Sequence, residues 1–205
     1  MGSYLVCVTG ASGSVYGLRV LSALSAGGHE VHALFSAWGA RVTLAETGEG
    51  AASWLDRAGI PASRRHDPAD LSAAVASGSF HLDGTVVAPC SMSTLGAVAS
   101  GAGANLVHRV CAVALKEGRP LVLVPRETPL SLIDLRNMSS LAEAGASIMP
   151  ASPGFYHRPA TVDELVDFMA GKILDRLGVA HSLCARWDGA LTGDARPGDH
   201  HGEPS

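Results

Sequence analysis

The sequence predicts one α/β domain built on a parallel sheet, and two observations support this fold class. Short apolar runs with polar flanks recur at 4–9, 31–35, 85–88 and 121–124, and each is typical of a strand buried on both faces of a parallel sheet. The 205 residues are 47% hydrophobic and only 17% charged, with 24 glycines, which is the composition of a globular domain with a sizeable core. No internal repeat or second domain is evident.

The elements follow in a regular order along the chain. The first strand runs into a glycine-rich turn at 10–17, which is neither a Walker loop nor a G-x-G-x-x-G fingerprint. Residues 48–70 are rich in Gly and Pro and predict short helix and loop, and 150–159 predicts another loop. A fifth strand is expected at 147–149, and helices are expected through 18–24, through 44–46, over 70–77, 105–117 and 130–144, and from Thr161 onward, where Glu164 completes a capping box.

Composition excludes several classes of function. A net charge of -4 gives no reason to expect a nucleic acid or a membrane surface as a partner, and no apolar run reaches the ~20 residues of a membrane span. No Cys/His cluster has metal-ligand spacing, and there is no signal peptide. The low surface charge favours a homo-oligomer. Four scattered cysteines predict buried, reduced thiols in a cytoplasmic protein: Cys7, Cys90, Cys111 and Cys184.

The stretch at 115–130 is the most informative part of the chain. Pro125 can donate no ladder hydrogen bond, so the strand at 121–124 should stop there and deliver Arg126 and Glu127 to the carboxyl end of the sheet. Ligands of open α/β sheets bind at that edge. An Arg beside a Glu could hold an anion and exchange a proton, although the pair could also be an ion pair that fixes a loop.

Polar groups follow three other strands. Ser12 lies in the glycine-rich turn, Ser36 follows the second strand, and Ser91 with Thr94 follows the third. These residues should converge with Arg126 at one edge, where they suit flavin mononucleotide (FMN) or another phosphate-bearing cofactor. The glycine-rich turn could itself cradle a phosphate, or it could merely reverse the chain. A dinucleotide is disfavoured, and a Ser-His-Asp hydrolase is disfavoured because Ser12 is not in a G-x-S-x-G elbow.

Two cations lie seven residues apart on the helix at 105–117. Arg109 and Lys116 are close to two turns apart, so they share one face. Such a stripe is either a solvated surface or part of an anion site.

Five motifs occur together in one order: Gly-Ala-Ser-Gly at 10–13 with Tyr-Gly at 16–17, Pro-Cys-Ser-Met at 89–92, Leu-Lys-Glu at 115–117, Pro-Arg-Glu-Thr-Pro at 125–129 and Phe-Tyr-His-Arg-Pro at 155–159. Over residues 4–187 the chain resembles the UbiX/Pad1 flavin prenyltransferases, which belong with the homo-oligomeric flavin-containing cysteine decarboxylases. The resemblance implies a three-layer, Rossmann-like (flavodoxin-like) domain over 1–187, a flexible tail over 188–205, and trimers within dodecamers that bind FMN at subunit interfaces.

The resemblance also implies the reaction. Members transfer a dimethylallyl group from dimethylallyl monophosphate to N5 and C6 of reduced FMN, without a metal, and the prenylated FMN serves UbiD-type decarboxylases. Arg109, Lys116, Tyr156 and Lys172 match the ligands of the prenyl phosphate. The matching catalytic residues are Glu127, Glu46, Lys116, Ser12 and Trp187, and the matching FMN contacts are Gly10, Ala11, Ser12, Ser36, Ser91, Met92, Ser93, Thr94 and Arg126.

The chain departs from the family pattern at three positions. Ala112 stands where an acid is usual, Gly118 where an Arg is usual, and Ala37 where a Lys is frequent. Two other functions therefore stay open at this point: an FMN-dependent oxidative decarboxylase of a cysteinyl substrate, and a non-catalytic FMN carrier or subunit of a decarboxylase.

Overall fold

A six-stranded, all-parallel sheet in the order β3-β2-β1-β4-β5-β6 is the centre of the molecule. The computed structural model describes residues 1–184; Trp187 and the proposed tail lie outside the described residues. The predicted fold class and the five expected strands are confirmed, and β5 ends at Pro125 as expected. The strands are β1 (Ser3–Val8), β2 (Glu30–Phe35), β3 (Arg65–His66), β4 (Gly84–Cys90), β5 (Leu121–Pro125) and β6 (Ser147–Ile148).

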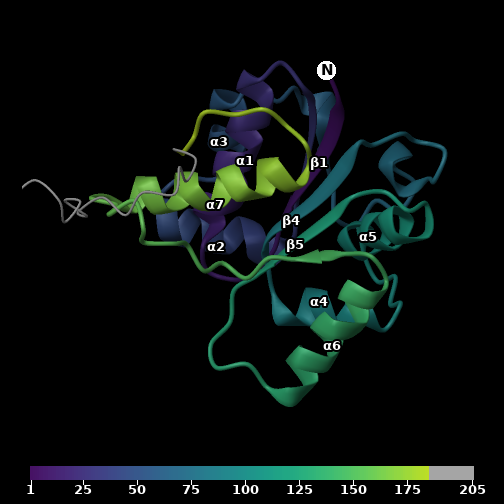
Figure 1. Cartoon of the computed structure of the whole chain (residues 1–205). Coiled ribbons are helices and arrows are strands. Elements are labelled where there is room, and N and C mark those ends of the chain that lie inside the picture. Colours follow the sequence, from purple (N-terminus) through teal and green to yellow (C-terminus); the bar gives the residue numbers. More distant parts are fainter. Residues whose placement is uncertain (185–205) are drawn as a thin grey trace, which may run out of the picture.

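Helices cover both faces of the sheet (Figure 1). On one face Leu5 and Leu123 pack with Val110 of α5 and Met138 of α6, and on the other face Val6 packs with residues of α1 and α7. This division follows the alternation of side chains along each strand. The helices are α1 (Ser14–Ala26), α2 (Ala37–Thr47), α3 (Ala51–Arg57), α4 (Met92–Ala99), α5 (Leu106–Lys116), α6 (Leu132–Glu143) and α7 (Val162–Arg176).

The structure differs from the prediction at 70–77, at β3 and at the cap of α7. Residues 70–77 form only one 3-10 turn, at Ala74–Ala76. The side chains of Asp67 and Asp70 accept hydrogen bonds from the backbone N–H groups of residues 69 and 72, and such local bonds compete with a helix. The two-residue edge strand β3 was not expected.

The capping boxes also differ from the prediction. At α7, Thr161 accepts from the N–H of Glu164 as expected, but Glu164 accepts in return from the N–H of Ala160 rather than from that of Thr161. A complete box caps α6 instead, where Ser131 and Asp134 bond reciprocally.

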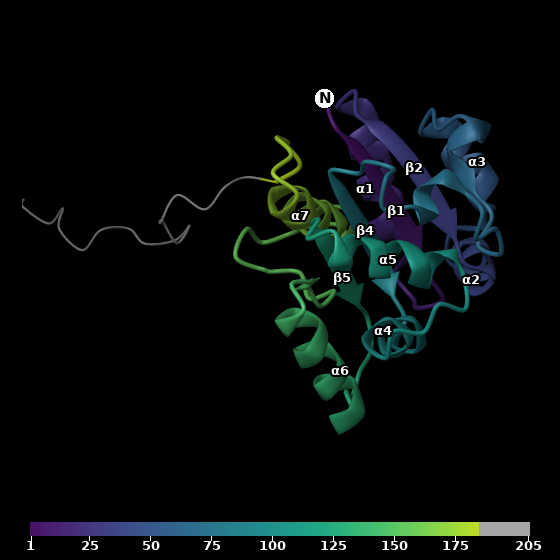
Figure 2. The ribbon, with the colours of Figure 1, turned by 90° about the vertical axis from the view of Figure 1, so that its right-hand side faces the viewer.

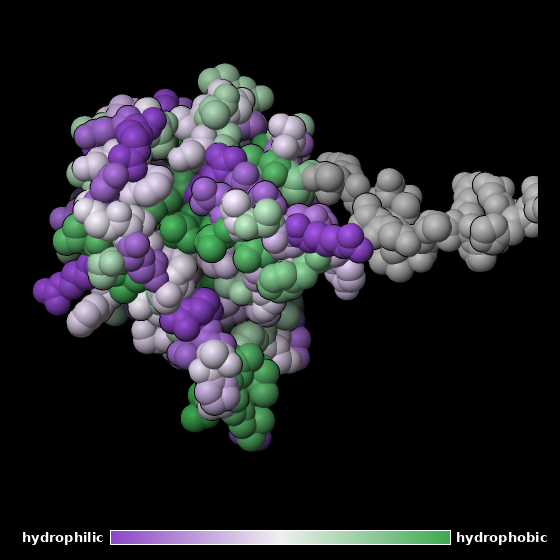
Figure 3. All heavy atoms as spheres, turned by 90° about the vertical axis from the view of Figure 1, so that its left-hand side faces the viewer, coloured by the Kyte–Doolittle hydropathy of each residue, from purple (hydrophilic) through white to green (hydrophobic). Residues whose placement is uncertain are grey.

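Helix α6 stands out from the body of the molecule and exposes apolar side chains (Figures 1 and 2). Leu132 and Ile133 are 61% and 69% exposed, and Leu130 and Leu135 are exposed beside them. Figure 3 shows hydrophobic side chains on this lower projection. An exposed apolar surface of this kind is typical of a subunit contact.

The thiols agree with the sequence prediction. Cys7, Cys90 and Cys111 are free thiols, and all three are buried. Burial raises the pKa of the Cys111 thiol to about 12 and that of Cys7 and Cys90 well above its usual range, so these thiols stay protonated. Within the described residues there is no metal-binding cluster of acidic, His or Cys side chains, and no helix there is long and apolar enough to cross a membrane.

Candidate active site

Four adjacent strands bring the predicted polar groups to one edge of the sheet. Ser36, Ser12, Ser91 and Arg126 follow β2, β1, β4 and β5, which are neighbours in that order. The strand arrowheads in Figure 2 point toward this edge, where α2 and α4 begin. Arg126 Nε donates to the Ser12 carbonyl oxygen at 3.2 Å, which joins two of the strand ends directly. The predicted convergence of these four residues at one edge is therefore confirmed. We call Ser12, Ser36, Ser91 and Arg126 the strand-end constellation.

Thr9 connects the ends of β1 and β4. Its hydroxyl donates to the Pro89 carbonyl at 2.8 Å and accepts from the Ser91 N–H at 2.8 Å, and Thr9 is only 1% exposed. The bridge fixes the backbone from which Ser91 caps α4. Sequence reasoning missed this residue, although a Thr in an otherwise apolar strand end was a visible signal.

The N-terminus of α4 presents a group of hydroxyls. Ser91 accepts from the Thr94 N–H at 3.3 Å, its hydroxyl donates to Thr94 Oγ1 at 3.0 Å, and Ser93 Oγ lies 3.3 Å away. The N-terminus of α2 is similar, because Ser36 accepts from the Gly39 N–H at 2.9 Å. Helix N-termini with hydroxyl caps are suited to a phosphate.

The glycine-rich turn is already filled by a carboxylate. Glu46, near the end of α2, accepts from the N–H of Gly13 at 2.9 Å, and from the N–H and hydroxyl of Ser14 at 2.9 and 2.7 Å. The anion in this cradle is thus part of the chain. The interpretation of the turn as a phosphate cradle was wrong for that reason, and a carboxylate from within the chain was not expected there.

The Glu46 carboxylate is stabilised in its charged form. Partial burial raises its pKa, but hydrogen bonds from the side chains of Ser12 and Ser14 and from the backbone of Gly13 and Ser14 together outweigh this effect. The net result is a pKa below the ordinary value of 4.5. Glu46 is therefore ionised at neutral pH and fixed beside Ser12.

Small residues let the backbones come close at this edge. A Cβ on Gly17 would lie 2.0 Å from the Ala88 carbonyl oxygen, so only glycine allows α1 to pack on β4 at this point. A Cβ on Gly10 would lie 2.6 Å from Cβ of Trp38. These contacts place the turn, with the buried Ala11, against its neighbours.

The predicted phosphate-binding cations do not join this constellation within one chain. Arg109 Nε donates to the Ala76 carbonyl at 2.9 Å, and Lys116 pairs with Glu117 beside Gly78, so the two cations share one face as expected. Lys116 precedes β5 and Arg126 follows it. Five strand residues span roughly 16 Å, which separates the two charges along the sheet.

The other predicted residues lie on further elements. Glu127 is exposed and accepts from the N–H of Thr128 at 3.0 Å. Tyr156, 74% exposed, lies in the loop before α7, and the exposed Lys172 lies on α7, across the sheet from α5. Lys116 and Arg126 therefore lie apart within one chain.

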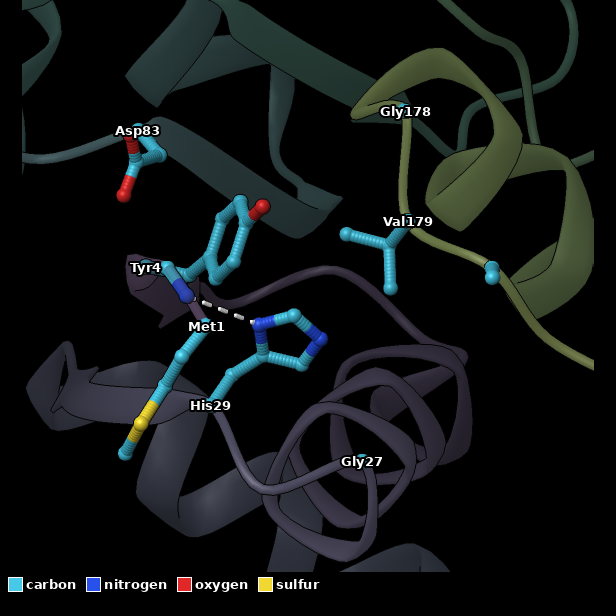
Figure 4. Close-up of a pocket in the computed structure, with 9 residues that line it drawn as sticks. Met1, Tyr4, Gly27, His29, Asp83, Gly178 and Val179 are labelled. Atoms are coloured by element: carbon cyan, nitrogen blue, oxygen red, sulfur yellow. Dashed lines mark hydrogen bonds between the residues drawn. The ribbon is translucent and has the colours of Figure 1, made fainter.

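A surface pocket lies at the opposite edge of the sheet (Figure 4). It has a volume of about 410 Å³ and is lined by Tyr4, His29 and Asp83 among other residues. His29 Nδ1 accepts from the Gly2 N–H at 3.1 Å, and Asp83 accepts from the Ser3 N–H at 2.7 Å. These contacts hold the start of β1, and they are remote from the strand-end constellation.

Comparison with known proteins defines the class first. The family described as Flavoprotein matches residues 3–174 of the chain. The flavin prenyltransferase UbiX of Halalkalibacterium halodurans is 44% identical over 192 residues, which are 91% of this chain and 93% of that protein. The chain belongs to this family, the UbiX flavin prenyltransferases, within the flavoprotein class.

Two solved structures agree with this assignment. AnUbiX (PadA1), crystallised with FMN and dimethylallyl pyrophosphate, has a TM-score of 0.88 and 39% identity, and the match covers 92% of this chain and 98% of that one. A dodecameric FMN-dependent UbiX-like decarboxylase from Escherichia coli O157:H7 has a TM-score of 0.86 and 40% identity, over 91% and 100% of the two chains.

Proposed function

We propose that the protein is a flavin prenyltransferase that joins a dimethylallyl group from dimethylallyl monophosphate to N5 and C6 of reduced FMN. The observation that carries the proposal is the strand-end constellation, in a chain that matches a UbiX structure with FMN and dimethylallyl pyrophosphate at a TM-score of 0.88. The prenylated FMN would serve a UbiD-type decarboxylase in the cytoplasm.

The carboxyl edge fits a flavin mononucleotide. The open N-termini of α2 and α4, with Ser36 and Ser91, offer donors to its phosphate. The glycine-rich turn lets backbone groups approach the ring system closely. The residues proposed to contact FMN are Gly10, Ala11, Ser12, Ser36, Ser91, Met92, Ser93, Thr94 and Arg126.

The site is completed between subunits. Lys116 of one copy would meet Arg126 and Glu127 of another, because one chain holds Lys116 and Arg126 roughly 16 Å apart along the sheet. Arg109 lies on the same face of α5 and would come with Lys116. The exposed apolar start of α6 supports a homo-oligomer, and the E. coli relative is dodecameric. We infer a trimer-based dodecamer for this protein.

Each proposed catalytic residue has a chemical task. Reduced FMN supplies the nucleophilic positions, N5 and C6. Arg109, Lys116 and Lys172 would stabilise the charge that builds on the departing phosphate, with Tyr156 as a hydroxyl donor. Glu127 would move a proton to that phosphate.

Two further residues would prepare and close the site. Glu46 fixes Ser12 through the hydrogen bonds described above. Trp187, outside the described residues, would cover the allyl group with its π face.

Mass spectrometry of the released flavin tests the proposal. The full-length protein is incubated anaerobically with reduced FMN and dimethylallyl monophosphate, and a flavin heavier by one C5 unit is expected. Bound but unchanged FMN would contradict the transferase assignment and point to a cysteinyl decarboxylase or an FMN carrier.

Mixing two inactive variants tests the shared site. Lys116→Ala and Glu127→Gln should each lower turnover by about 100-fold while FMN still binds. Co-refolded or co-expressed together, they should regain activity because some interfaces combine two intact halves. Arg57→Gln, on the remote α3, serves as the active control. No recovery in verified mixed oligomers would place both residues in one subunit's site.

A further inference from the structure

Trp38 is an exposed aromatic residue at the edge that carries the proposed flavin site. It lies in the first turn of α2 and is 66% exposed. Its neighbours are two of the proposed FMN contacts: Ser36 caps the same helix, and Gly10 lies against Cβ of Trp38. The exposed indole presents a large apolar face with a polar N–H at this edge, which is a suitable surface for a ring system to pack on.

Arg41 lies over this indole. Its guanidinium carbon is 5.0 Å from the centroid of the Trp38 ring, a cation–π contact between residues three apart on one helix face. Helical side chains lean toward the N-terminus of their helix. The charge of Arg41 is therefore carried toward the N-terminus of α2, where the first N–H groups have no intrahelical acceptor.

A second pair of the same kind shows what is different at Arg41. Arg57 stacks on Trp54 at 4.3 Å, on α3, and it is also paired with Glu49. Among the ion pairs within residues 1–184, none involves Arg41. An uncompensated cation fixed beside a helix N-terminus favours an anion.

We propose that Trp38 and Arg41 extend the flavin site: the indole lies against the bound nucleotide and holds the guanidinium where it binds the nucleotide's phosphate. The inference rests on the proposed function and adds two residues to it. Ser36, the N-terminus of α2 and Arg41 then act on the same phosphate, as charge-assisted hydrogen bonds allow.

Binding of FMN and of riboflavin, which lacks the phosphate, separates the two roles. For Arg41→Gln we expect about tenfold weaker FMN binding and unchanged riboflavin binding. For Trp38→Ala we expect weaker binding of both ligands. Arg57→Gln and Trp54→Phe are the matched controls and should bind both ligands as the wild type does. Flavin fluorescence titration of the full-length protein gives the affinities.

Several outcomes would overturn the inference. If Arg41→Gln binds FMN as tightly as Arg57→Gln does, Arg41 does not contact the phosphate. A Trp38→Ala variant with wild-type affinities but a changed oligomer mass would assign the indole to a contact between copies. These results are independent of prenyl transfer, because a wild-type protein that binds FMN without forming a prenylated flavin refutes the proposed function alone.

Discussion

The N-termini of α1 and α4 lie at the same edge of the sheet, yet among the described residues a carboxylate of the chain occupies only that of α1. Each follows a buried strand through a turn of small residues. The N-terminus of α1 has no side-chain cap of its own and is filled by Glu46 from α2. The N-terminus of α4 is capped by its own Ser91, and no carboxylate of the described residues bonds to it.

The difference shows that local sequence does not decide which helix N-terminus stays available to a ligand. Backbone N–H groups attract any anion, so a carboxylate supplied by another helix competes with a phosphate for them. Under the proposed function, the N-terminus of α4 is therefore the one that receives the phosphate, while the turn before α1 fixes Ser12. Four predictions test this contrast, from the largest expected effect to the smallest.

Ser91→Asp should turn the N-terminus of α4 into a copy of that of α1. Aspartate is a good helix cap, so the free energy of unfolding should change by less than about 0.5 kcal/mol. Its charge should repel the phosphate and weaken FMN binding about 100-fold, or about 2.7 kcal/mol. Ser91→Asn is the neutral control and should bind FMN within about tenfold of the wild type. Equal affinities for the two variants would place the phosphate elsewhere.

Thr9→Val should remove the bridge that orients Ser91. The substitution leaves the part-buried N–H of Ser91 without its acceptor and the buried Pro89 carbonyl without its donor, which should lower the free energy of unfolding by about 2 kcal/mol. Denaturant unfolding measures the loss. Thr43→Val is the control: Thr43 is also buried, but its hydroxyl bonds only to a carbonyl in its own helix, so a loss below about 1 kcal/mol is expected. Similar losses would show that the bridge adds no stability.

Glu46→Gln should destabilise the glycine-rich turn. The charge at the N-terminus of α1 is lost while one acceptor oxygen remains, and the site is partly exposed, so about 1 kcal/mol is expected. Glu49→Gln removes the exposed ion pair with Arg57 and should cost less than about 0.5 kcal/mol. If the free energy of unfolding falls by the same amount in both variants, the contacts of Glu46 with the glycine-rich turn contribute no more than a surface ion pair does.

The pH dependence of stability should reveal the same carboxylate. Its pKa is lower in the folded protein than the ordinary 4.5, so its stabilising effect is complete above about pH 5 and fades as the pH falls through 4.5 and then through the lower folded value. The stability difference between the wild type and Glu46→Gln should shrink over that acid range. A difference that stays constant down to pH 3 would contradict the lowered pKa.

Short-range sequence patterns predicted much of the fold and most of the polar residues at the carboxyl edge of the sheet. Apolar runs marked the strands, Pro125 marked the end of β5, and the polar residues after each strand marked the constellation, because parallel strands bring their carboxyl ends together. Local patterns failed where local bonds compete, as at Asp67 and Asp70, and at β3, whose two residues Arg65 and His66 form no apolar run.

The sequence by itself determined the fold class, the family motifs and the edge at which the polar residues converge, since these depend on periodicity and chain order. Only the tertiary structure decided that Glu46 fills the turn of α1 and that Thr9 holds Ser91. Each of these facts depends on residues 33 or 82 positions apart in the chain meeting in space. Such distances are set by how whole helices and strands pack, and no local pattern encodes them.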